Sequence, residues 1–526
     1  MALPALQQRT ISAAFARVLA TAPDRVAHVG QEGTWTFAEA YERSCRVGAG
    51  LFALDPEPRV PIALMLDNSL DFVHTWMGLA LGGGVQVPVN TGYRGSFLAH
   101  ILNDAGCRVL VLEAGYLDRL RAVLPDLRHL ETVVVRGGAA LELPELTVVD
   151  LDDLFAAAPL VPAPIDQGDL IAYMYTSGTT GPSKGVEVTH AHAYTYASRE
   201  DQPRPNADDR LLVTLPLFHL AGQWYGVYQA LIAGATCVLE PSFSVSRWWD
   251  TVRAHGITVA TMLGAMAELL QQTPPREDDA DNPLTLAVMA PLASDPVAFS
   301  RRYGVTLEPV YGMSEIGAVL GAYGSELRPG EAGVPRAEYE LRLVGPDGRD
   351  VEDGVIGELW VRPRHRELVM ARYHGLPDKT ADTLQDGWVH TGDSFRLQEG
   401  HFFFADRMKD ALRRRGENVS SFEVERVINE HPAVHESAVV GVPSSLSEDE
   451  IKAVVVPHEG VVVDPEELTA YLVARMPYFM VPRYVSFAPE LPKTPTLKTQ
   501  KHVLRDTGTA DCWDREAAGI VLRRGH

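Results

Sequence analysis

The sequence has few cysteines, no long apolar run and fewer basic than acidic residues. Four cysteines stand among 526 residues, and no two of them form a Cys-x-x-Cys pair. This usage excludes a disulfide framework and a cysteine zinc site, and it favours a reducing compartment. The longest apolar stretch, residues 76–85, has about half the length that a membrane-spanning helix needs. The first 25 residues show no export signal, so we expect a soluble cytoplasmic protein.

The excess of acidic over basic residues limits the classes of molecule that the chain can bind. With 47 Lys and Arg against 69 Asp and Glu, the formal net charge is −22. Such a chain repels bulk nucleic acid and anionic membranes, although a local basic pocket can still bind a phosphate-bearing ligand. Repeats and low-complexity tracts are also absent, and the 46% of hydrophobic residues excludes wholesale disorder. We therefore expect small-molecule ligands and no nucleic acid or membrane span, with a homodimer as a working hypothesis.

Short apolar runs alternate with longer amphipathic segments over most of the chain. Seven runs are short and rich in β-branched residues or Leu, as buried parallel strands are: residues 109–112, 132–135, 211–215, 236–239, 258–261, 284–289 and 306–310. With the intervening segments 116–124 and 248–254 read as helices, they predict an α/β fold with doubly wound mixed sheets. Two further runs, 340–344 and 356–361, flank a turn-rich Gly-Pro-Asp-Gly and predict a small antiparallel subdomain.

The chain from about residue 410 predicts a separate, small α+β domain. Ser420 and Glu423 have capping-box spacing at the start of one helix, and Asp464 followed by Pro465 opens another helix. Two strand-like runs, 437–442 and 451–457, lie between these helices. We place the boundary near residues 406–410, which gives an N-terminal domain of residues 1–408 and a mobile C-terminal domain of residues 409–526.

A tract rich in Ser, Thr and Gly, residues 175–185, is the most informative segment. It follows an apolar run and reads Tyr-Thr-Ser-Gly-Thr-Thr-Gly-Pro-Ser-Lys-Gly. Glycines and small hydroxyl residues expose backbone N–H groups, and one lysine adds a cation, which suits a loop that folds over phosphates. It is not a Walker A motif, because Pro and Ser separate the second Gly from the Lys. A flexible linker is the alternative, but it does not explain the Pro and Lys in register. We predict phosphate contacts from Thr176, Ser177, Gly178, Thr179, Thr180, Gly181 and Lys184.

This tract is the first of several ordered motifs by which the chain resembles the adenylate-forming enzymes, the superfamily of acyl-CoA synthetases, luciferases and peptide-synthetase adenylation domains. The resemblance extends from Trp35-Thr36-Phe37 to about Arg505. Residues 414–421, Arg-Arg-Gly-Glu-Asn-Val-Ser-Ser, are most similar to the branch of crotonobetaine/carnitine-CoA ligases and related bacterial acyl-CoA ligases. The resemblance implies ATP, Mg²⁺ and CoA as cofactors and a small-molecule carboxylic acid as the substrate.

The segment Tyr311-Gly312-Met313-Ser314-Glu315 follows the strand run 306–310, and strand ends are where α/β sheets place their ligands. The resemblance implies that Tyr311 stacks on adenine, that Ser314 contacts the α-phosphate, and that Glu315, together with Thr176, holds Mg²⁺. Gly312 and Met313 complete this nucleotide-binding segment. A hydrolase nucleophile elbow is disfavoured, because Gly-Met-Ser is followed by Glu-Ile and not by x-Gly.

Other matches to the family extend the nucleotide site. Asp393, in a turn-rich Thr-Gly-Asp stretch, is implied to accept hydrogen bonds from the ribose hydroxyls. Ala290 and Pro291 match the loop that flanks adenine. Arg407 is implied to contact ribose or phosphate, and Lys409 to be the hinge between the domains. The run of Arg413, Arg414 and Arg415 reads either as a solvated face or as a guide for CoA phosphates.

The remaining matches concern the acyl transfer itself. Lys498 occupies the position of the catalytic lysine, with Leu497 where relatives usually have Gly; we choose it over Lys493 and Lys501 because the Thr-Pro-Thr prefix fixes the register. His219 is implied to lie near the reacting carbonyl. Gly416 and Glu417 belong to a loop expected to approach the thiol channel after the domain rotates. Three apolar residues, Trp224, Tyr225 and Met289, are expected near the acyl pocket.

The resulting prediction is an ATP-dependent acid–thiol ligase, with Lys498, His219, Glu315 and Thr176 as catalytic residues. Three alternatives remain: an amide-forming ligase that uses an amine acceptor, an adenylation enzyme that loads a separate carrier protein, and a non-catalytic binding protein. The last is disfavoured because all the charged motif residues are present. The pair His190 and His192 has metal-ligand spacing, but no third ligand lies nearby in sequence, so we expect a structural role.

Overall fold

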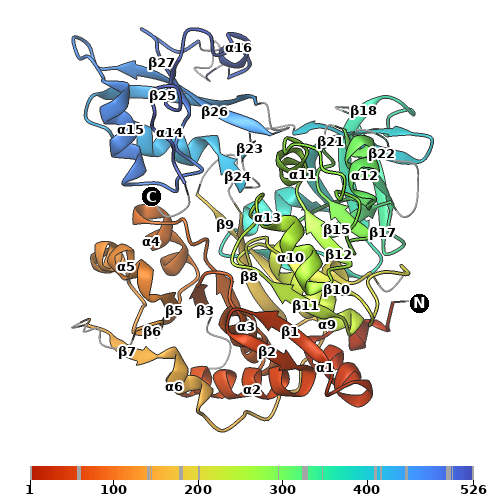
Figure 1. Ribbon diagram of the computed structural model, residues 1–526. Coiled ribbons are helices and arrows are strands. Elements are labelled where there is room, and N and C mark those ends of the chain that lie inside the picture. Colours follow the sequence, from red (N-terminus) through yellow and green to blue (C-terminus); the bar gives the residue numbers. More distant parts are fainter. Residues whose placement is uncertain are drawn as a thin grey trace.

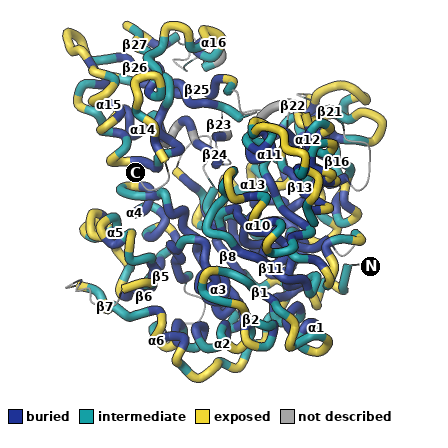
Figure 2. Tube along the Cα trace, viewed as in Figure 1, coloured by how far each residue is buried: buried dark blue, intermediate teal, exposed yellow. Residues whose placement is uncertain are grey.

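The computed structural model describes residues 3–55, 61–138, 143, 145–176, 182–199, 202–293, 295–322, 328, 330–345, 347–407, 411–414, 417–444, 448–492, 499 and 501–523 (Figure 1). Two large β-sheets with helices on their faces form the bulk of the molecule, and a smaller α+β unit sits at one end. Figure 2 shows the buried residues concentrated along the strands and the central helices, with exposed residues on the outer helices and loops. The predicted fold class is confirmed.

The larger sheet has 14 strands, and its order is β17-β18-β21-β22-β16-β15-β14-β13-β12-β10-β11-β1-β2, with β20 beside β21. Its parallel half comprises β1 Val26–Gly30, β10 Arg210–Val213, β11 Thr236–Leu239, β12 Val259–Met262, β13 Leu286–Met289 and β14 Thr306–Met313. The antiparallel strands are β2 Gly33–Thr36, β15 Gly317–Gly321, β16 Glu331–Pro335, β17 Tyr339–Val344, β18 Ile356–Pro363, β20 Leu384–Gln385, β21 Trp388–Gln398 and β22 His401–Arg407. The antiparallel subdomain predicted around residues 340–361 is therefore one end of this sheet.

The second sheet has eight strands in the order β19-β9-β8-β4-β3-β5-β6-β7. Their bounds are β3 Ile62–Met65, β4 Gln86–Pro88, β5 Val109–Glu113, β6 Thr132–Arg136, β7 Thr147–Asp150, β8 Leu170–Thr176, β9 Lys184–Thr189 and β19 Arg372–Tyr373. Its central strands are parallel and nearly continuous in Val, Leu and Ile, as strands covered on both faces are.

The helices of the N-terminal part cover the two sheets. They are α1 Ile11–Thr21, α2 Phe37–Leu54, α3 Leu70–Leu81, α4 Gly95–Asp104, α5 Leu117–Val123, α6 Leu151–Phe155, α7 His190–Ala197, α8 Leu220–Gly222, the π-helix Gln223–Tyr228, α9 Gln229–Ala233, α10 Trp248–His255, α11 Gly264–Gln271, α12 Pro296–Tyr303 and α13 Pro377–Thr383. Every residue of α3 is buried. It crosses α2 so closely that a Cβ on Gly78 would lie 2.2 Å from the Ser44 carbonyl oxygen, so only glycine fits there. None of the described helices combines the length and the apolar character that crossing a bilayer requires.

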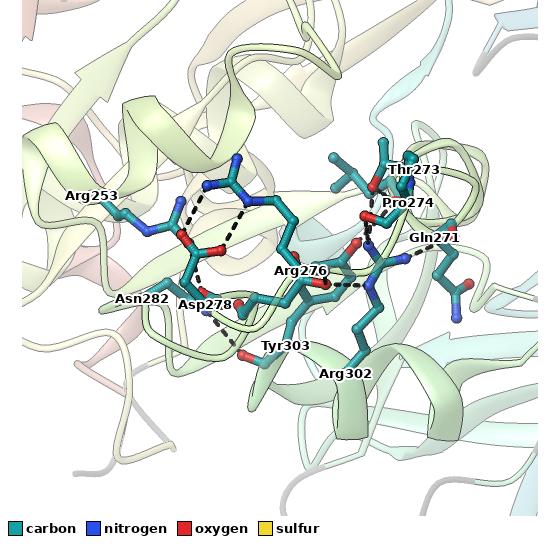
Figure 3. Close-up of polar contacts among 11 residues, drawn as sticks. Arg253, Gln271, Thr273, Pro274, Arg276, Asp278, Asn282, Arg302 and Tyr303 are labelled. Carbon is teal, nitrogen blue, oxygen red and sulfur yellow. Dashed lines mark hydrogen bonds and ion pairs between the residues drawn. The ribbon is translucent and has the colours of Figure 1, made fainter.

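The polar cluster in Figure 3 fixes the loop between α11 and β13, where the chain enters β13. From α12, Arg302 donates to Asp279 Oδ2 at 2.7 Å and to the Gln271 carbonyl at 2.8 Å. Arg276 pairs with both carboxylate oxygens of Asp278, at 2.9 and 3.0 Å. At its other end α11 begins at Gly264, where a Cβ would lie 2.8 Å from the Pro291 carbonyl oxygen. The cluster therefore fixes the C-terminal end of α11, and the N-terminal end of the helix packs closely on the loop that contains Ala290 and Pro291.

The C-terminal unit contains a hairpin, a four-stranded sheet and three helices. The hairpin is β23 Ala411–Arg414 with β24 Glu417–Ser420, and the sheet has the order β25-β26-β27-β28: Val434–Pro443, Asp449–Pro457, Tyr484–Phe487 and Trp513–Asp514. The helices are α14 Ser421–Asn429, α15 Pro465–Val473 and α16 Lys501–Asp506. The predicted N-cap is present, since the Asp464 side chain accepts from the Glu466 N–H at 2.8 Å.

Two expectations about local structure need correction. The strand expected to end at residue 310 continues to Met313, because Tyr311, Gly312 and Met313 pair with β15. The stretch around Thr391, Gly392 and Asp393 is not a turn but part of β21, paired with β18 and β22. In both cases ladder hydrogen bonds to a neighbouring strand outweigh the local turn preference of glycine.

Candidate active site

Tyr311 and Asp393 meet at one edge of the larger sheet. The Tyr311 hydroxyl donates to Asp393 Oδ2 at 2.7 Å, and the Asp393 residue is only 6% exposed. Their strands, β14 and β21, are separated in the sheet by β15, β16 and β22, so the sheet curls to bring them together. Phe395 packs edge-on against the Tyr311 ring at 4.7 Å between centroids and fixes its orientation. An aromatic face and a buried acceptor carboxylate thus lie side by side, as a nucleoside site requires.

The backbone around Asp393 is fixed by its own contacts. Gly392 has φ of 70°, a conformation that favours glycine, and its N–H donates to Glu358 Oε1 at 2.9 Å. The Asp393 N–H donates to the Thr391 hydroxyl at 3.1 Å. Across the β21–β22 ladder, Asp393 is the register partner of Arg407. The structure therefore brings two of the predicted nucleotide-binding residues, Asp393 and Arg407, to paired backbone positions, and Tyr311 reaches Asp393 through its side chain.

Glu315 and Lys184 approach each other through a tyrosine that the sequence analysis missed. The Tyr373 hydroxyl donates to Glu315 Oε1 at 2.8 Å, and Lys184 Nζ lies 5.1 Å from the centroid of the Tyr373 ring. Burial and the neighbouring Glu315 carboxylate raise the pKa of Tyr373, so its hydroxyl stays protonated and donates. Lys184 and Tyr373 belong to the second sheet and Glu315 follows β14 of the first sheet, so the site spans both sheets.

The charged groups on this side suit a Mg²⁺ ion that is bound mainly through substrate phosphates. The described residues contain no group of three or more His, Cys, Asp or Glu that could enclose a metal on their own. Glu315, 6% exposed, offers one carboxylate, and Mg²⁺ commonly binds one or two protein oxygens together with phosphate oxygens and water. Glu315 and the Thr176 hydroxyl fit that donor set; Mg²⁺ would supply positive charge against phosphate oxygens.

The Ser/Thr/Gly tract connects two paired strands. Thr176 at the end of β8 is the register partner of Lys184 at the start of β9, so the tract closes an antiparallel hairpin. Its flanks are tied to α4: the Tyr175 hydroxyl donates to Asp104 at 2.6 Å, and His100 Nε2 contacts the Ser183 carbonyl at 2.8 Å. Ser177, Gly178, Thr179, Thr180 and Gly181 lie outside the described residues.

The segments expected around adenine and the acyl group follow adjacent strands. Ala290 and Pro291 come directly after β13, and the Ala290 N–H donates to the Met262 carbonyl at 3.1 Å. Ser314 follows β14 and is 6% exposed, whereas a Cβ on Gly312 would lie 2.3 Å from the Gly317 carbonyl, which explains the glycine. The apolar residues expected near the acyl pocket are all buried: Trp224, Tyr225 and Met289.

His219 contacts a residue of the C-terminal hairpin. Its Nε2 lies 2.5 Å from Glu417 Oε2, and the same carboxylate oxygen accepts from Asn90 Nδ2 at 3.5 Å. Asn90 lies just beyond the end of β4, so residues from three distant segments meet here; the sequence analysis missed it. The contact joins two of the predicted residues, His219 and Glu417, across 198 positions of sequence.

Other residues of the C-terminal unit are engaged in its own structure. Arg414 is 2% exposed, pairs with Glu450 and donates to the Val481 carbonyl at 2.7 Å, so it is neither solvated nor turned towards CoA phosphates, which corrects that expectation. Lys501 Nζ lies 2.7 Å from both Glu425 Oε1 and Ser421 Oγ. The described residues do not include Lys498, Lys493, Lys409, which we expect to be the hinge, or Gly416 and Arg415.

His190 and His192 are buried in α7, with no hydrogen-bond partner for any of their ring nitrogens among the described residues. Burial lowers the pKa of His190 to about 4 and that of His192 to about 3, so both are neutral at pH 7. Their burial in the helix agrees with the structural role expected for them.

Comparisons with known proteins agree with this architecture. The model of the AMP-binding enzyme family matches residues 15–374, and that of the AMP-binding enzyme C-terminal domain matches residues 423–498. These two matches define the class of protein: an AMP-binding enzyme with a separate C-terminal domain. The chain belongs to the AMP-binding family of adenylate-forming enzymes, which includes acyl-CoA ligases.

Similar proteins indicate the range of chemistry within the family. The crotonobetaine/carnitine–CoA ligase of Citrobacter koseri is 31% identical over 457 residues, which cover 84% of this chain and 88% of that protein. The o-succinylbenzoate-CoA synthetase of Bacillus subtilis, solved with a product analogue, superposes with a TM-score of 0.81 at 25% identity and 94% coverage of this chain and 98% of that chain. The amide bond synthetase of Marinactinospora thermotolerans gives 0.80 at 26% identity, with 94% and 99% coverage.

Proposed function

We propose that this chain is an acid–CoA ligase that forms an acyl-adenylate from ATP and a carboxylic acid and then transfers the acyl group to CoA. In the first half-reaction the carboxylate oxygen bonds to the α-phosphorus of ATP while the bond to pyrophosphate breaks. In the second, the CoA sulfur bonds to the acyl carbon, AMP leaves, and the thiol proton passes to solvent. Both steps are accelerated by groups that stabilise the negative charge developing on phosphoryl or carbonyl oxygens.

The proposed site residues have distinct roles in the first half-reaction. Tyr311 offers its ring to adenine, and Asp393, which Tyr311 holds by a 2.7 Å hydrogen bond, accepts from the ribose hydroxyls. Lys184 and the amides of the Ser/Thr/Gly tract bind phosphates, and Glu315, oriented by Tyr373, provides the carboxylate next to them. Lys498 supplies the cation that bridges the attacking carboxylate and the α-phosphate.

One observation carries the assignment of the second half-reaction: the contact of Glu417 with His219. It supports a role for the C-terminal hairpin beside the acyl group, because we propose that His219 lies next to the reacting carbonyl. Figure 1 shows α16, which begins three positions after Lys498, on the side of the C-terminal unit that faces away from the N-terminal sheets. A domain that presents Glu417 to His219 and carries α16 on its far side has the orientation that we expect for thioester formation, which supports a thiol acceptor.

The amide-forming ligase is the second candidate, supported by the 0.80 TM-score to an amide bond synthetase. Its first half-reaction is the same, and only the acceptor differs. The same holds for loading a separate carrier protein. Pyrophosphate release alone therefore identifies the adenylation, and the dependence on the acceptor identifies the ligase.

The experiment that tests the proposal measures pyrophosphate release with MgATP across a panel of short-chain, medium-chain, aryl, steroid-like and betaine acids, each with and without CoA. We expect sustained release that needs both one class of acid and CoA, with the acyl-CoA detected by mass spectrometry. Release that needs the acid and is indifferent to CoA would reject the CoA acceptor, and addition of an amine panel would then test the amide ligase.

A further inference from the structure

The short connection between β4 and α4, residues 89–94, touches the C-terminal unit at two separate points. At its end, Arg94 Nη1 donates to the carbonyl oxygen of Val473 at 2.9 Å. Val473 is the last residue of α15, and the last carbonyls of a helix lack intrahelical partners and carry partial negative charge. The guanidinium of one domain therefore caps the C-terminus of a helix in the other domain.

At its beginning, the same connection reaches the acyl side of the site. Asn90 Nδ2 lies 3.5 Å from Glu417 Oε2, and Glu417 contacts His219. Residues 90 and 94 are only four positions apart, so the two contacts act on the C-terminal unit from one short piece of backbone. The contact of Arg94 with α15 and the contact of Glu417 with His219 therefore belong to one orientation of the domains.

Packing around the connection is close. A Cβ on Gly92 would lie 3.2 Å from the Phe479 ring and 3.3 Å from the Pro477 side chain, so this glycine lets the C-terminal unit approach the backbone. Tyr93 and Phe97 are buried in the same apolar cluster as Phe479. Burial and the nearby Arg119 lower the pKa of Arg94, although an arginine remains charged at pH 7. A cation half-removed from water gains most from the partial charge of a helix end.

We propose that Arg94 is a positioning residue for the second half-reaction, which holds the C-terminal domain in the orientation that presents Glu417 to His219. The proposal rests on the two-step ligase proposed above. Arg94 contacts no reacting atom; it acts through α15 and the hairpin. The adenylation orientation, in which Lys498 reaches the α-phosphate, requires the C-terminal domain to turn, and the Val473 carbonyl then leaves Arg94.

The test separates the two half-reactions. Arg94→Met keeps much of the side-chain length and removes the donors, Arg94→Lys keeps a charge and a donor, and Gly92→Ala disturbs the same contact from the backbone side. Arg128→Met, an exposed arginine after α5, is the matched control. With the acid that the panel identifies, acyl-AMP formation is measured as ATP–pyrophosphate exchange, and thioester formation is measured from preformed acyl-AMP with saturating CoA.

For Arg94→Met and Gly92→Ala we expect thioester formation to slow about tenfold, the size of one charge-assisted hydrogen bond. Exchange should stay within twofold of wild type, Arg94→Lys should recover most of the rate, and Arg128→Met should behave as wild type. An equal loss in both half-reactions would reduce Arg94 to a stabilising residue and overturn the proposal. A change confined to the KM for CoA would also overturn it, because Arg94 would then meet CoA and not position the domain.

A distance measurement keeps the test independent of the acceptor. Spin labels at the exposed positions Asp118 on α5 and Glu467 on α15, in a Cys512→Ser background, report the separation of the domains in the chain without substrates. We expect Arg94→Met to broaden or shift this distance distribution, whereas Arg128→Met leaves it unchanged. Identical distributions for wild type and Arg94→Met would refute the role of Arg94 even if the acceptor proves to be an amine.

Discussion

The residues proposed to bind the nucleotide lie on the two N-terminal sheets, whereas His219, proposed to lie beside the acyl group, contacts the C-terminal unit. Tyr311 donates to Asp393 at 2.7 Å and Tyr373 donates to Glu315 at 2.8 Å, and all four residues belong to the N-terminal part of the chain. His219 instead finds its partner in Glu417 of the C-terminal hairpin. In the proposed mechanism the contacts to the nucleotide are made on a surface formed within the N-terminal part, whereas the thioester step also needs the small domain docked with Glu417 at His219.

The largest expected effect comes from Lys498→Ala, which removes the cation proposed to bridge the attacking carboxylate and the α-phosphate. Acyl-AMP formation should fall by about 10²–10³-fold, the loss typical when one group that stabilises transition-state charge is removed. Thioester formation from preformed acyl-AMP should stay within about threefold. Lys493→Ala in the same segment is the control, and a comparable loss there would contradict the choice of lysine.

Acid should lower the free energy of unfolding of the N-terminal part through its buried histidines, His190 and His192. The lowered pKa values of His190 and His192, about 4 and about 3, mean that the unfolded chain binds protons which the folded chain excludes between about pH 6.5 and 4. Stability contributed by the neutral rings is therefore present near pH 7 and lost as the pH falls. From pH 7 to 5, each ring should lower the free energy of unfolding by about 2 kcal/mol.

Denaturant unfolding of His192→Leu, measured between pH 5 and 7.5, checks this expectation. The variant should lose about 2 kcal/mol less than wild type on acidification, because one excluded proton has been removed. His435→Gln, at an exposed position of β25, is the control and should keep the wild-type slope. Parallel slopes for His192→Leu and wild type would show that His192 is protonated within the fold.

A smaller effect is expected from the contact between Tyr311 and Asp393. Asp393→Asn should raise the KM for ATP about tenfold, because a charged acceptor for the ribose is lost. Tyr311→Phe keeps the ring that would stack on adenine. It should raise the KM for ATP only about threefold, which corresponds to the loss of one neutral hydrogen bond. Initial rates of pyrophosphate exchange against ATP concentration measure both, and the two effects should not add, since the side chains share one hydrogen bond. Fully additive effects would mean that the tyrosine does not orient the carboxylate.

The sequence predicts the strands better than the helices. The β-branched runs at 109–112, 132–135 and 236–239 lie within or match strands of the structure, because buried parallel strands are apolar on both faces. Helix α3 shows in the sequence only as an apolar run near residues 76–85, since a helix buried on every side has no amphipathic pattern. From the sequence alone, the stretch of Thr391, Gly392 and Asp393 is typical of a turn. Its strand conformation depends on pairing with β18 and β22, which no local pattern indicates.

The residues of the candidate site, too, can be predicted from the sequence only in part. The ordered motifs identify Tyr311, Glu315 and Asp393, whose roles stay predictions, but no local pattern indicates which side chain orients each of them. Tyr373 lies 58 positions from Glu315, and Asn90 lies 327 positions from Glu417. Such contacts depend on the curl of a 14-stranded sheet and on the docking of a domain, which are properties of the whole chain.

The central claim is that the contact of Glu417 with His219 serves only the second half-reaction. It is tested most directly by single-turnover measurement of both half-reactions in Glu417→Gln. Glutamine keeps the size of the side chain and removes the charge that faces His219 and Asn90. We predict that acyl-AMP forms at the wild-type rate and accumulates, while its conversion to the thioester slows about tenfold. An equal slowing of acyl-AMP formation, or an unchanged thioester step, would contradict the account.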